Sequence, residues 1–319
     1  MSDPIIQVEN IRKVYNAPGG HTVEAVNGVS FEVGRQEIFG LLGPNGAGKS
    51  TTIGMLTTTV VITGGKAAIA GHDVANDPIG VKKTIAIVPQ SVNLDRSLTA
   101  RENLIFHGKY FGIAKEERES RADELLELMA LSDRSGDYPA TLSGGMARRL
   151  QIARALMHNP EVLFLDEATT GLDPQSRLMI WHKVRELNEA GQTIVLTTHY
   201  MEEADQLCDR VAILDKGRVL ALDKPAKLKE MIPGGNVVEL RTTEHCAPLE
   251  GWLREEMAGL HKVECEDNTL RLYLSRPEDA LVRIVETVRS HGVALESVQL
   301  HPVTLEDVFM HLTGKGLRE

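Results

Sequence analysis

A nine-residue stretch, GPNGAGKST, holds the side chains of this 319-residue sequence that are best suited to chemistry. It fits the phosphate-binding pattern G-x-x-x-x-G-K-[ST], which runs here from Gly43 to Ser50. Glycines let the backbone adopt left-handed angles and pass close to a phosphate group. Backbone N–H groups at the start of a following helix can then donate to that phosphate. The stretch therefore predicts a phosphate site.

The side chains of this stretch suggest a nucleotide with a bound cation. Lys49 can neutralise the outer phosphates, and the Ser50 hydroxyl can complete a Mg²⁺ shell. An apolar run from Gln36 to Gly43 precedes the loop, as expected of a buried parallel strand, and a helix is expected after it. The predicted ligands are the consecutive residues Gly43, Pro44, Asn45, Gly46, Ala47, Gly48, Lys49, Ser50 and Thr51.

Two adjacent carboxylates follow a second apolar run, in the stretch VLFLDE. Ligands of open α/β sheets lie just beyond the carboxyl ends of the strands, where Asp166 and Glu167 are expected. Asp166 can hold Mg²⁺ directly or through water, and Glu167 can accept a proton from an attacking water. A plain surface turn is the alternative, but a buried strand leading into the pair favours the metal and base roles.

Three further side chains stand at the ends of predicted strands. Gln90 follows TIAIVPQ and can ligate Mg²⁺ or orient water, although a lone glutamine is more often a surface side chain. His199 ends QTIVLTTH, where contact with a terminal phosphate is favoured over a structural role. Tyr15 can stack on a base, because every base has a π-face, or can pack in the core; the sequence leaves both open.

A second candidate anion site begins at LSGGM. Ser143 is a good helix N-cap, and Gly144 and Gly145 allow a close approach to the helix N-terminus. Nothing adjacent in the sequence supplies an anion, so a plain capped helix is the simpler interpretation of this stretch alone. A helix is also expected from Pro174, directly after the segment TGLD that ends at Asp173.

Together these stretches resemble the nucleotide-binding subunit of ATP-binding cassette (ABC) transporters over about residues 5–223. GPNGAGKST is similar to the Walker A motif, VLFLDE to Walker B, Gln90 to the Q-loop, LSGGM to the family signature, TGLD to the D-loop, and TTH to the switch histidine. The resemblance implies ATP and Mg²⁺ as cofactors, and an ATPase with Glu167 as base. It also implies that Tyr15 is the base-stacking aromatic and that Asp173 belongs to the nucleotide site.

The resemblance further implies a homodimer. In this family two chains pair head to tail, and Ser143, Gly144 and Gly145 of one would close on the terminal phosphate held by the other. Met146 and Ala168 depart from the usual glutamine and proline. Met146 and the segments HYMEEADQLCDRV and PVTLEDVFMHLTG resemble the ABC-2 exporter type, in particular ATP-binding proteins of the daunorubicin-resistance type.

The expected fold class is an α/β P-loop core with an antiparallel β subdomain and a helical subdomain at about residues 91–160. Residues 1–225 are predicted to form this ATP-binding domain. Residues 226–319 are predicted to form an accessory α+β domain in the ferredoxin-like order β-α-β-β-α-β. A final helix carries an apolar stripe of Leu305, Val308, Phe309 and Leu312, which must dock on its own domain or on a second subunit.

Composition limits the partners and the cellular location that can be expected. The net charge of −10 disfavours a nucleic-acid partner, and no apolar run approaches the ~20 residues that span a bilayer. The N-terminus lacks the basic and apolar regions of a signal peptide. Cys208, Cys246 and Cys265 are widely spaced, so neither a disulfide framework nor a zinc site is expected. A cytoplasmic, reduced protein at the inner face of the cell membrane is predicted.

The favoured function is ATP hydrolysis that powers export of a drug-, lipid- or polysaccharide-like substrate through a separate ABC-2 type permease. The alternative is a non-transport ABC ATPase that acts on ribosomes or DNA. Such relatives usually carry tandem cassettes or a long coiled-coil insertion, and this sequence shows neither. A pure ATP-dependent scaffold would lack the base, whereas Glu167 is present.

Overall fold

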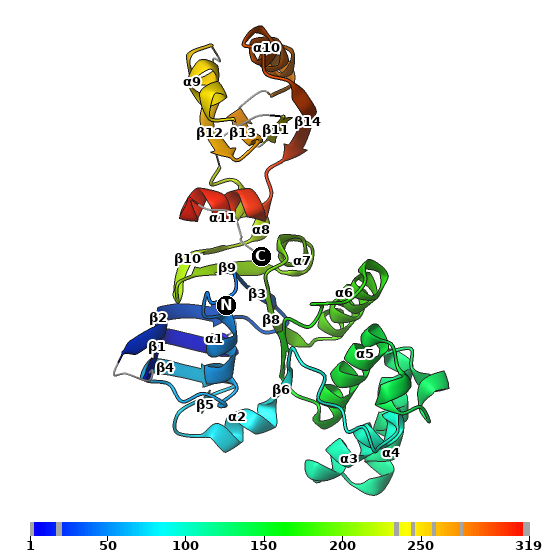
Figure 1. Ribbon diagram of the computed structural model, residues 1–319. Helices are drawn as coiled ribbons and strands as arrows, with labels where there is room; N and C mark the ends of the chain where they lie inside the picture. The colour runs from blue at the N-terminus through cyan, green and yellow to red at the C-terminus, as the bar shows by residue number, and fades with distance from the viewer. Residues whose placement is uncertain are drawn as a thin grey trace. The chain divides into compact units, whose positions relative to one another are not determined.

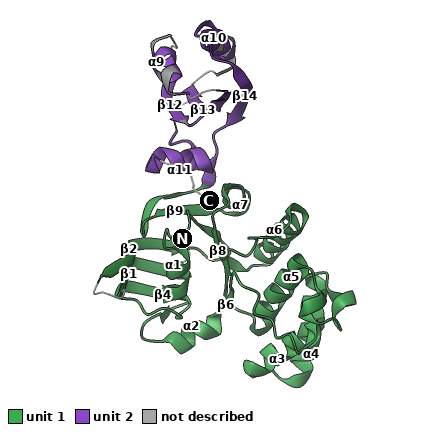
Figure 2. Ribbon diagram, viewed as in Figure 1, with its two compact units in different colours: residues 1–224, 318–319 green, residues 225–317 purple. Residues whose placement is uncertain are grey.

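The computed structural model describes residues 3–16, 21–232, 236–243, 246–256, 260–274 and 277–314. The chain divides into two compact units (Figure 2). Unit 1 comprises residues 1–224 and 318–319, and unit 2 comprises residues 225–317. Each unit has its own sheet and its own apolar core.

A six-stranded sheet forms the centre of unit 1 (Figure 1). Five neighbouring strands are parallel, and β10 pairs antiparallel with β9. The middle strands β3 and β8 are buried along their length, as parallel strands covered on both faces must be. In order across the sheet the strands are β10 (Arg218–Asp223), β9 (Arg210–Asp215), β3 (Ile38–Leu42), β8 (Thr193–Thr198), β7 (Val162–Asp166) and β6 (Ile85–Val88).

A second, antiparallel sheet packs its apolar side chains into the same core as the six-stranded sheet. Its strands in order are β2 (Thr22–Val33), β1 (Ile6–Asn16), β4 (Gly64–Ile69) and β5 (His72–Asp73). The helices that accompany the two sheets are α1 (Lys49–Leu56), α2 (Pro78–Thr84), α6 (Pro174–Glu189) and α7 (Met201–Leu207).

A group of helices between β6 and β7 forms the helical part of unit 1 (Figure 1). It contains α3 (Ala100–Tyr110), α4 (Lys115–Leu128), the short 3₁₀ turns η1 (Ser132–Arg134) and η2 (Pro139–Thr141), α5 (Gly144–Ala155) and η3 (Leu156–His158). A capping box of Thr99 and Glu102 is present at the start of α3. The predicted α/β fold with antiparallel and helical parts is therefore confirmed.

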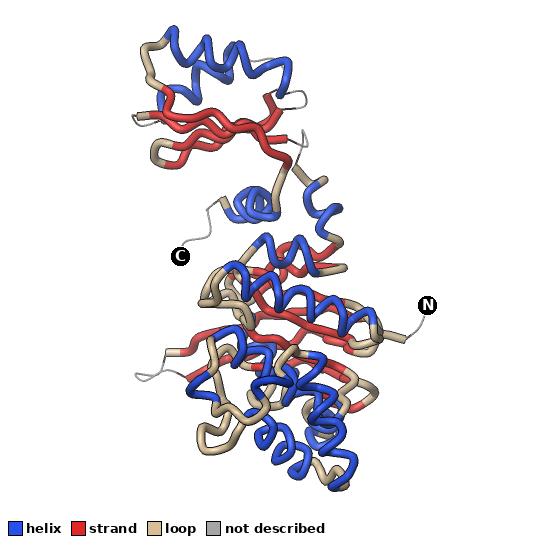
Figure 3. The backbone as a smooth tube through the Cα atoms, turned by 90° about the vertical axis from the view of Figure 1, so that its right-hand side faces the viewer, coloured by secondary structure: helices blue, strands red, loops and turns tan. Residues whose placement is uncertain are grey.

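Unit 2 is a four-stranded antiparallel sheet with helices on both faces (Figure 3). Its strands in order are β12 (Leu260–Glu266), β13 (Thr269–Leu274), β11 (Asn236–Thr242) and β14 (Leu295–Pro302). Helices α9 (Ala247–Glu256) and α10 (Pro277–Ser290) connect these strands in the predicted β-α-β-β-α-β order. Two more helices, α8 (Pro225–Lys229) and α11 (Leu305–Thr313), contact each other.

The last helix docks within its own unit. Leu305, Val308 and Phe309 are buried, as the apolar stripe requires, whereas Leu312 is half-buried. The Arg271 guanidinium on β13 reaches the Met310 sulfur, and Lys262 on β12 lies 3.3 Å from His311 Nδ1. The face of the sheet opposite α9 and α10 is therefore covered by α11.

The prediction about cysteines was wrong for one pair. Cys246, at the start of α9, and Cys265, on β12, form a disulfide across a sequence separation of 19 residues. The Cys246 N–H donates to the Asp267 carbonyl oxygen (3.1 Å) at the turn between β12 and β13, so Cys246 lies beside Cys265, which spacing along the sequence does not reveal. Cys208 is a free, buried thiol, and burial raises its pKa well above the usual value.

Candidate nucleotide-binding site

The glycine-rich loop connects the central strand β3 to α1, as expected. Gly48 takes left-handed angles (φ 101°) at the N-cap of α1. A Cβ atom there would lie 2.6 Å from the Ala25 carbonyl oxygen, and one at Gly43 would lie 2.3 Å from the Leu214 carbonyl oxygen. The fold therefore requires glycine at both positions, and the N–H groups of the first turn of α1 are left for a ligand.

The Lys49 amine is buried inside the loop. It donates to the carbonyl oxygens of Gly43 (2.7 Å) and Pro44 (3.1 Å) and lies 3.3 Å from Glu167 Oε1. Burial lowers the pKa of Lys49, and the neighbouring Glu167 carboxylate acts in the opposite direction. A phosphate beside this amine would supply the negative charge that best compensates its burial.

The carboxyl end of β7 carries a chain of hydrogen bonds to the loop. Ser50 Oγ donates to Asp166 Oδ1 (3.3 Å), and Thr197 Oγ1 on β8 donates to the same oxygen (2.6 Å). Thr197 Oγ1 in turn accepts from the Glu167 backbone N–H (2.9 Å). Ser50 and Asp166, which are 116 positions apart, therefore meet as the paired oxygen donors that the sequence predicted.

Glu167 lies at the centre of the site, with φ 46° and a buried side chain. Its Oε1 faces Lys49, while its Oε2 accepts from Gln90 Nε2 (3.2 Å) and from Thr170 Oγ1 (3.4 Å). His199 Nδ1 lies 3.4 Å from the same Oε2, but within the described residues it makes no hydrogen bond. Three of the predicted side chains thus converge on one carboxylate.

The remaining predicted residues lie at helix starts and on β1. Ser143 caps α5 by accepting from the Met146 N–H (3.3 Å), and Asp173 caps α6 by accepting from the Ser176 N–H (2.9 Å). A Cβ atom at Gly145 would lie 2.5 Å from Ser176 Oγ, so this glycine lets α5 approach α6. No contact joins Ser143 or Gly144 to the loop within the described hydrogen bonds. Tyr15 is half-exposed, and Lys13 Nζ lies 4.9 Å from its ring centroid.

Sequence reasoning missed several polar residues that support the site. Thr197 links Asp166 to the Glu167 backbone, and Thr170 reaches the Glu167 carboxylate. Buried Glu203 on α7 accepts from Thr169 (2.7 Å) and from the Trp181 indole N–H (2.9 Å), so the segment after Glu167 is joined to α6 and α7. Each of these residues has polar neighbours in the sequence, so only its partner in the folded chain identifies it as part of the site.

Comparisons with known proteins agree with this geometry. Residues 26–170 match the family model described as ABC transporter. The linearmycin resistance ATP-binding protein LnrL of Bacillus subtilis is 39% identical over 99% of this chain and 100% of its own length. The chain belongs to the ABC transporter family of ATP-binding proteins. A second family model, the C-terminal domain of DrrA1-3-like ATP-binding proteins, matches residues 224–313.

Other relatives and structures extend the similarity of this ABC protein. The daunorubicin/doxorubicin resistance ATP-binding protein DrrA of Streptomyces peucetius is 39% identical over 97% of this chain and 92% of its own length. The Nod factor export ATP-binding protein I of Ralstonia nicotianae is 40% identical over 100% and 96%. A dimeric ATP-binding cassette in a post-hydrolysis state with ADP and phosphate bound gives a TM-score of 0.63 at 29% identity, over 69% of this chain and 98% of that chain.

As a member of this family, the chain is an ATP-binding subunit with ATPase activity. Within the described residues, no helix is long and apolar enough to cross a bilayer. The same residues include no group of three or more His, Cys, Asp or Glu side chains placed to hold a metal ion. Mg²⁺ needs no such cluster, because it binds through one or two protein oxygens together with phosphates and water. Ser50 and Asp166 fit that requirement.

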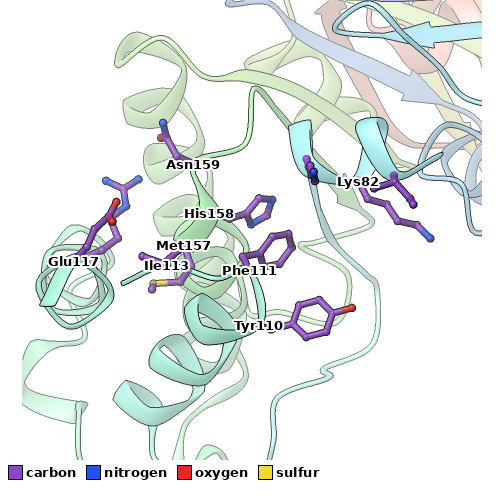
Figure 4. Close-up of a pocket in the computed structure, with 11 residues that line it drawn as sticks. Lys82, Tyr110, Phe111, Ile113, Glu117, Met157, His158 and Asn159 are labelled. Atoms are coloured by element: carbon purple, nitrogen blue, oxygen red, sulfur yellow. The ribbon is translucent and has the colours of Figure 1, made fainter. Parts of the chain in front are cut away.

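A separate pocket lies apart from the nucleotide site (Figure 4). It is lined from α2, from the end of α3, from α4 and from η3, and none of the predicted nucleotide ligands lines it. Ile79 and Tyr110 at its rim are 69% and 81% exposed. The ring of Phe111 stacks on His158 with centroids 3.9 Å apart. Large exposed apolar side chains beside a pocket are typical of a contact surface.

Proposed function

We propose that this chain is the ATPase subunit of an exporter and drives a separate ABC-2 type permease from the cytoplasmic face of the membrane. The observation that carries the proposal is the convergence of Lys49, Gln90 and His199 on the Glu167 carboxylate, beside the Ser50–Asp166 pair. The names of the similar resistance and export proteins support the choice of an exporter. The net charge of −10 supports a partner other than nucleic acid.

The roles within the site follow from chemistry and position. The loop from Gly43 to Thr51 binds the phosphates, with Lys49 compensating their charge. Ser50, Asp166 and Gln90 would hold Mg²⁺, which supplies charge neutralisation at the phosphates when bound. Glu167 accepts the proton of the attacking water, because its carboxylate is the ionisable oxygen group at the centre of the site.

The other proposed ligands complete the nucleotide's surroundings. His199 contacts the terminal phosphate through its unpartnered ring nitrogen, and Tyr15 stacks on the base through its exposed face. Ser143, Gly144, Gly145 and Asp173 act across a homodimer, because among the described hydrogen bonds none joins the N-terminus of α5 to the phosphate loop of the same chain. The dimeric assembly of the similar cassette supports this arrangement. The unit formed by residues 225–317 is proposed as an accessory domain.

Equilibrium ATP binding and turnover test the phosphate site. Lys49→Ala should weaken binding of Mg²⁺-ATP by about tenfold or more, because a charged hydrogen-bond donor to phosphate is lost. Lys66→Ala, which removes an exposed lysine on β4, is the matched control and should bind ATP normally. Equal affinities in the two variants would contradict the phosphate-binding role of Lys49.

Mixing two inactive variants tests the composite site. Ser143→Ala and Lys49→Ala homodimers each carry a defect in both sites. A mixed dimer has one site with the intact loop of the Ser143→Ala chain and the intact Ser143 of the Lys49→Ala chain. Activity should therefore return on mixing, to about half of the per-dimer rate at most. A mixture that stays as inactive as its components would contradict a site shared between two chains.

We assign the permease contact to the pocket rim formed by Ile79 and Tyr110. Their exposure beside a pocket lined by both apolar and charged side chains suits an amphipathic cytoplasmic segment of the permease, which can place apolar side chains against Ile79 and the Tyr110 ring. Tyr110→Ser should reduce co-purification of this chain with a co-expressed ABC-2 type permease partner. Leu178→Ser, at a 60% exposed position on α6, is the control and should co-purify normally. An equal loss of co-purification in both variants would contradict a permease contact at this rim.

A further inference from the structure

A buried arginine on α5 joins the helical part to the segment that carries Gln90. Arg148, in the second turn of α5, is only 4% exposed. Its Nη1 donates to the Pro89 carbonyl oxygen and its Nη2 to the Gln90 carbonyl oxygen, each at 2.6 Å. Two short bonds from one planar guanidinium fix both the position and the direction of this backbone.

Two more residues on the same side of α5 continue the contact. Gln151 Nε2 donates to the Ser91 carbonyl oxygen (3.0 Å), and Arg154 Nη1 donates to the Asn93 carbonyl oxygen (2.7 Å). Residues three and six positions after Arg148 fall near the same face of a helix. The backbone from residue 89 to residue 93, here called the Gln90 segment, is therefore held along α5 by side-chain donors.

Burial of the Arg148 charge is electrostatically unfavourable for folding. No carboxylate pairs with it among the ion pairs of the described residues, and its buried Nε has no hydrogen-bond partner there. Burial lowers the pKa of its guanidinium. A buried charge balanced only by carbonyl dipoles adds little to stability compared with an apolar side chain. Its retention is better explained by the geometry that it imposes on the Gln90 segment.

We infer that Arg148 is a positioning residue, which holds the Gln90 side chain against Glu167 and transmits movement of α5 to it. Ser143, at the N-terminus of the same helix, belongs to the site of the opposite chain in the proposed dimer. Engagement of one ATP by Ser143 would thus shift Gln90 in the other site through a rigid helix. This inference rests on the proposed function for the roles of Gln90 and Ser143.

The neighbouring residue provides a matched control. Arg149 is also buried, at 7% exposed, and burial lowers its pKa as well. Its Nη1 donates to the carbonyl oxygens of Met129 (2.5 Å) and Ala130 (3.1 Å), at the end of α4. Arg149 therefore makes the same kind of bond from the same helix, but within the helical part alone.

The test is a double-mutant cycle on ATP turnover with Gln90→Ala, Arg148→Met and their combination, beside Arg149→Met. Arg148→Met should lower kcat by about 10²-fold, the effect of misplacing an active-site group by about 1 Å, with little change in KM. The double variant should be no slower than the slower single variant, because both changes disable the same side chain. Arg148→Lys, which can reach one of the two carbonyls, should restore part of kcat.

Three outcomes would overturn the inference: additive effects in the cycle, an equal loss of kcat in the Arg149 variant, or no loss in the Arg148 variants. If Arg148→Met does not fold, the same cycle is run with Arg148→Lys. The decrease in kcat caused by Arg148→Lys must then disappear when Gln90→Ala is already present.

Hydrogen exchange of the nucleotide-free protein separates this inference from the proposed function. Arg148→Lys should speed exchange of the amides of residues 90–93, and Arg149→Lys should leave them unchanged. If the wild-type protein has no ATPase activity but Arg148→Lys still speeds this exchange, then Arg148 holds the Gln90 segment and only the proposed function fails. If the wild-type protein is an active ATPase but Arg148→Lys leaves this exchange unchanged, then the positioning role of Arg148 is contradicted and the proposed function is not.

Discussion

Polar side chains are paired differently in the two units. In unit 2 the polar side chains beneath α11 are matched in pairs: Arg271 with Glu239 (3.0 Å), and Lys262 with Glu264 (2.5 Å). The Tyr273 hydroxyl also donates to Glu264 (2.7 Å), and burial raises its pKa. In unit 1, Lys49, Gln90 and His199 crowd around one carboxylate, and the His199 nitrogen that faces it has no hydrogen bond within the described chain.

The difference separates a site from a scaffold. Side chains that are already paired offer a ligand few unsatisfied hydrogen-bonding groups, so these pairs indicate a structural role for unit 2. In unit 1 the groups around Glu167 include a buried His199 nitrogen without a hydrogen bond among the described residues, so an incoming anion would supply a partner for it. The predictions below test whether chemistry and stability divide between the units in this way, and they begin with the largest expected effect.

Glu167→Gln should abolish turnover while preserving ATP binding. The amide keeps the shape of the side chain but cannot accept the proton, so kcat should fall by roughly 10²–10⁴-fold, or about 3–5 kcal/mol of barrier. Steady-state turnover and equilibrium binding measure the two effects. Turnover at the wild-type rate would remove Glu167 from the role of base.

Phe309→Ala should destabilise unit 2 and leave the nucleotide site intact. Phe309 lies on α11 and its ring is buried, and truncation of a buried phenylalanine costs about 3–5 kcal/mol. Thermal unfolding should show a lowered transition for unit 2, with ATP affinity unchanged. The nucleotide-free dimerisation constant is measured as well. Weakened dimerisation with normal unfolding would mean that the helix docks on a second subunit instead.

Replacing both Cys246 and Cys265 by serine should lower the stability of unit 2 by about 3 kcal/mol. A cross-link that closes a loop of this length removes entropy from the unfolded chain. Denaturant unfolding with and without a reductant measures the effect, and the reductant should change only the wild type. A matching loss of ATP turnover would show that the two units are not functionally separate.

Acidification should destabilise unit 1 through His107. Burial, followed by the charge of Arg154 and the neighbouring His158, lowers the pKa of His107 to about 4. The unfolded chain therefore takes up this proton near pH 6.5, while the folded chain stays neutral until about pH 4. Stability should fall between these values by roughly 1–2 kcal/mol, since partial exposure screens the effect. His107→Gln should flatten this part of the pH profile of unfolding; an unchanged profile would contradict the assignment.

Local patterns in the sequence were sufficient for most of the fold. The apolar runs that end at Gly43, Asp166 and His199 predicted strands. These runs form β3, β7 and β8, which are neighbouring strands within the sheet. The predicted start of α6 at Pro174 is confirmed by its N-cap Asp173, and such a start is readable from sequence because capping involves residues only three positions apart. The types of the nucleotide-site residues were also readable, since a phosphate loop is one continuous stretch.

Tertiary structure alone decided which of these residues meet. Lys49 faces Glu167, Arg148 binds the carbonyls of the Gln90 segment, and Cys246 is bonded to Cys265. These contacts span 19 to 118 positions, and they depend on strand order and on the packing of α5 against β6, which no repeating pattern encodes. A sequence specifies side chains and their local periodicity, whereas the geometry of a site is fixed when distant strand ends come to lie at one edge of a sheet.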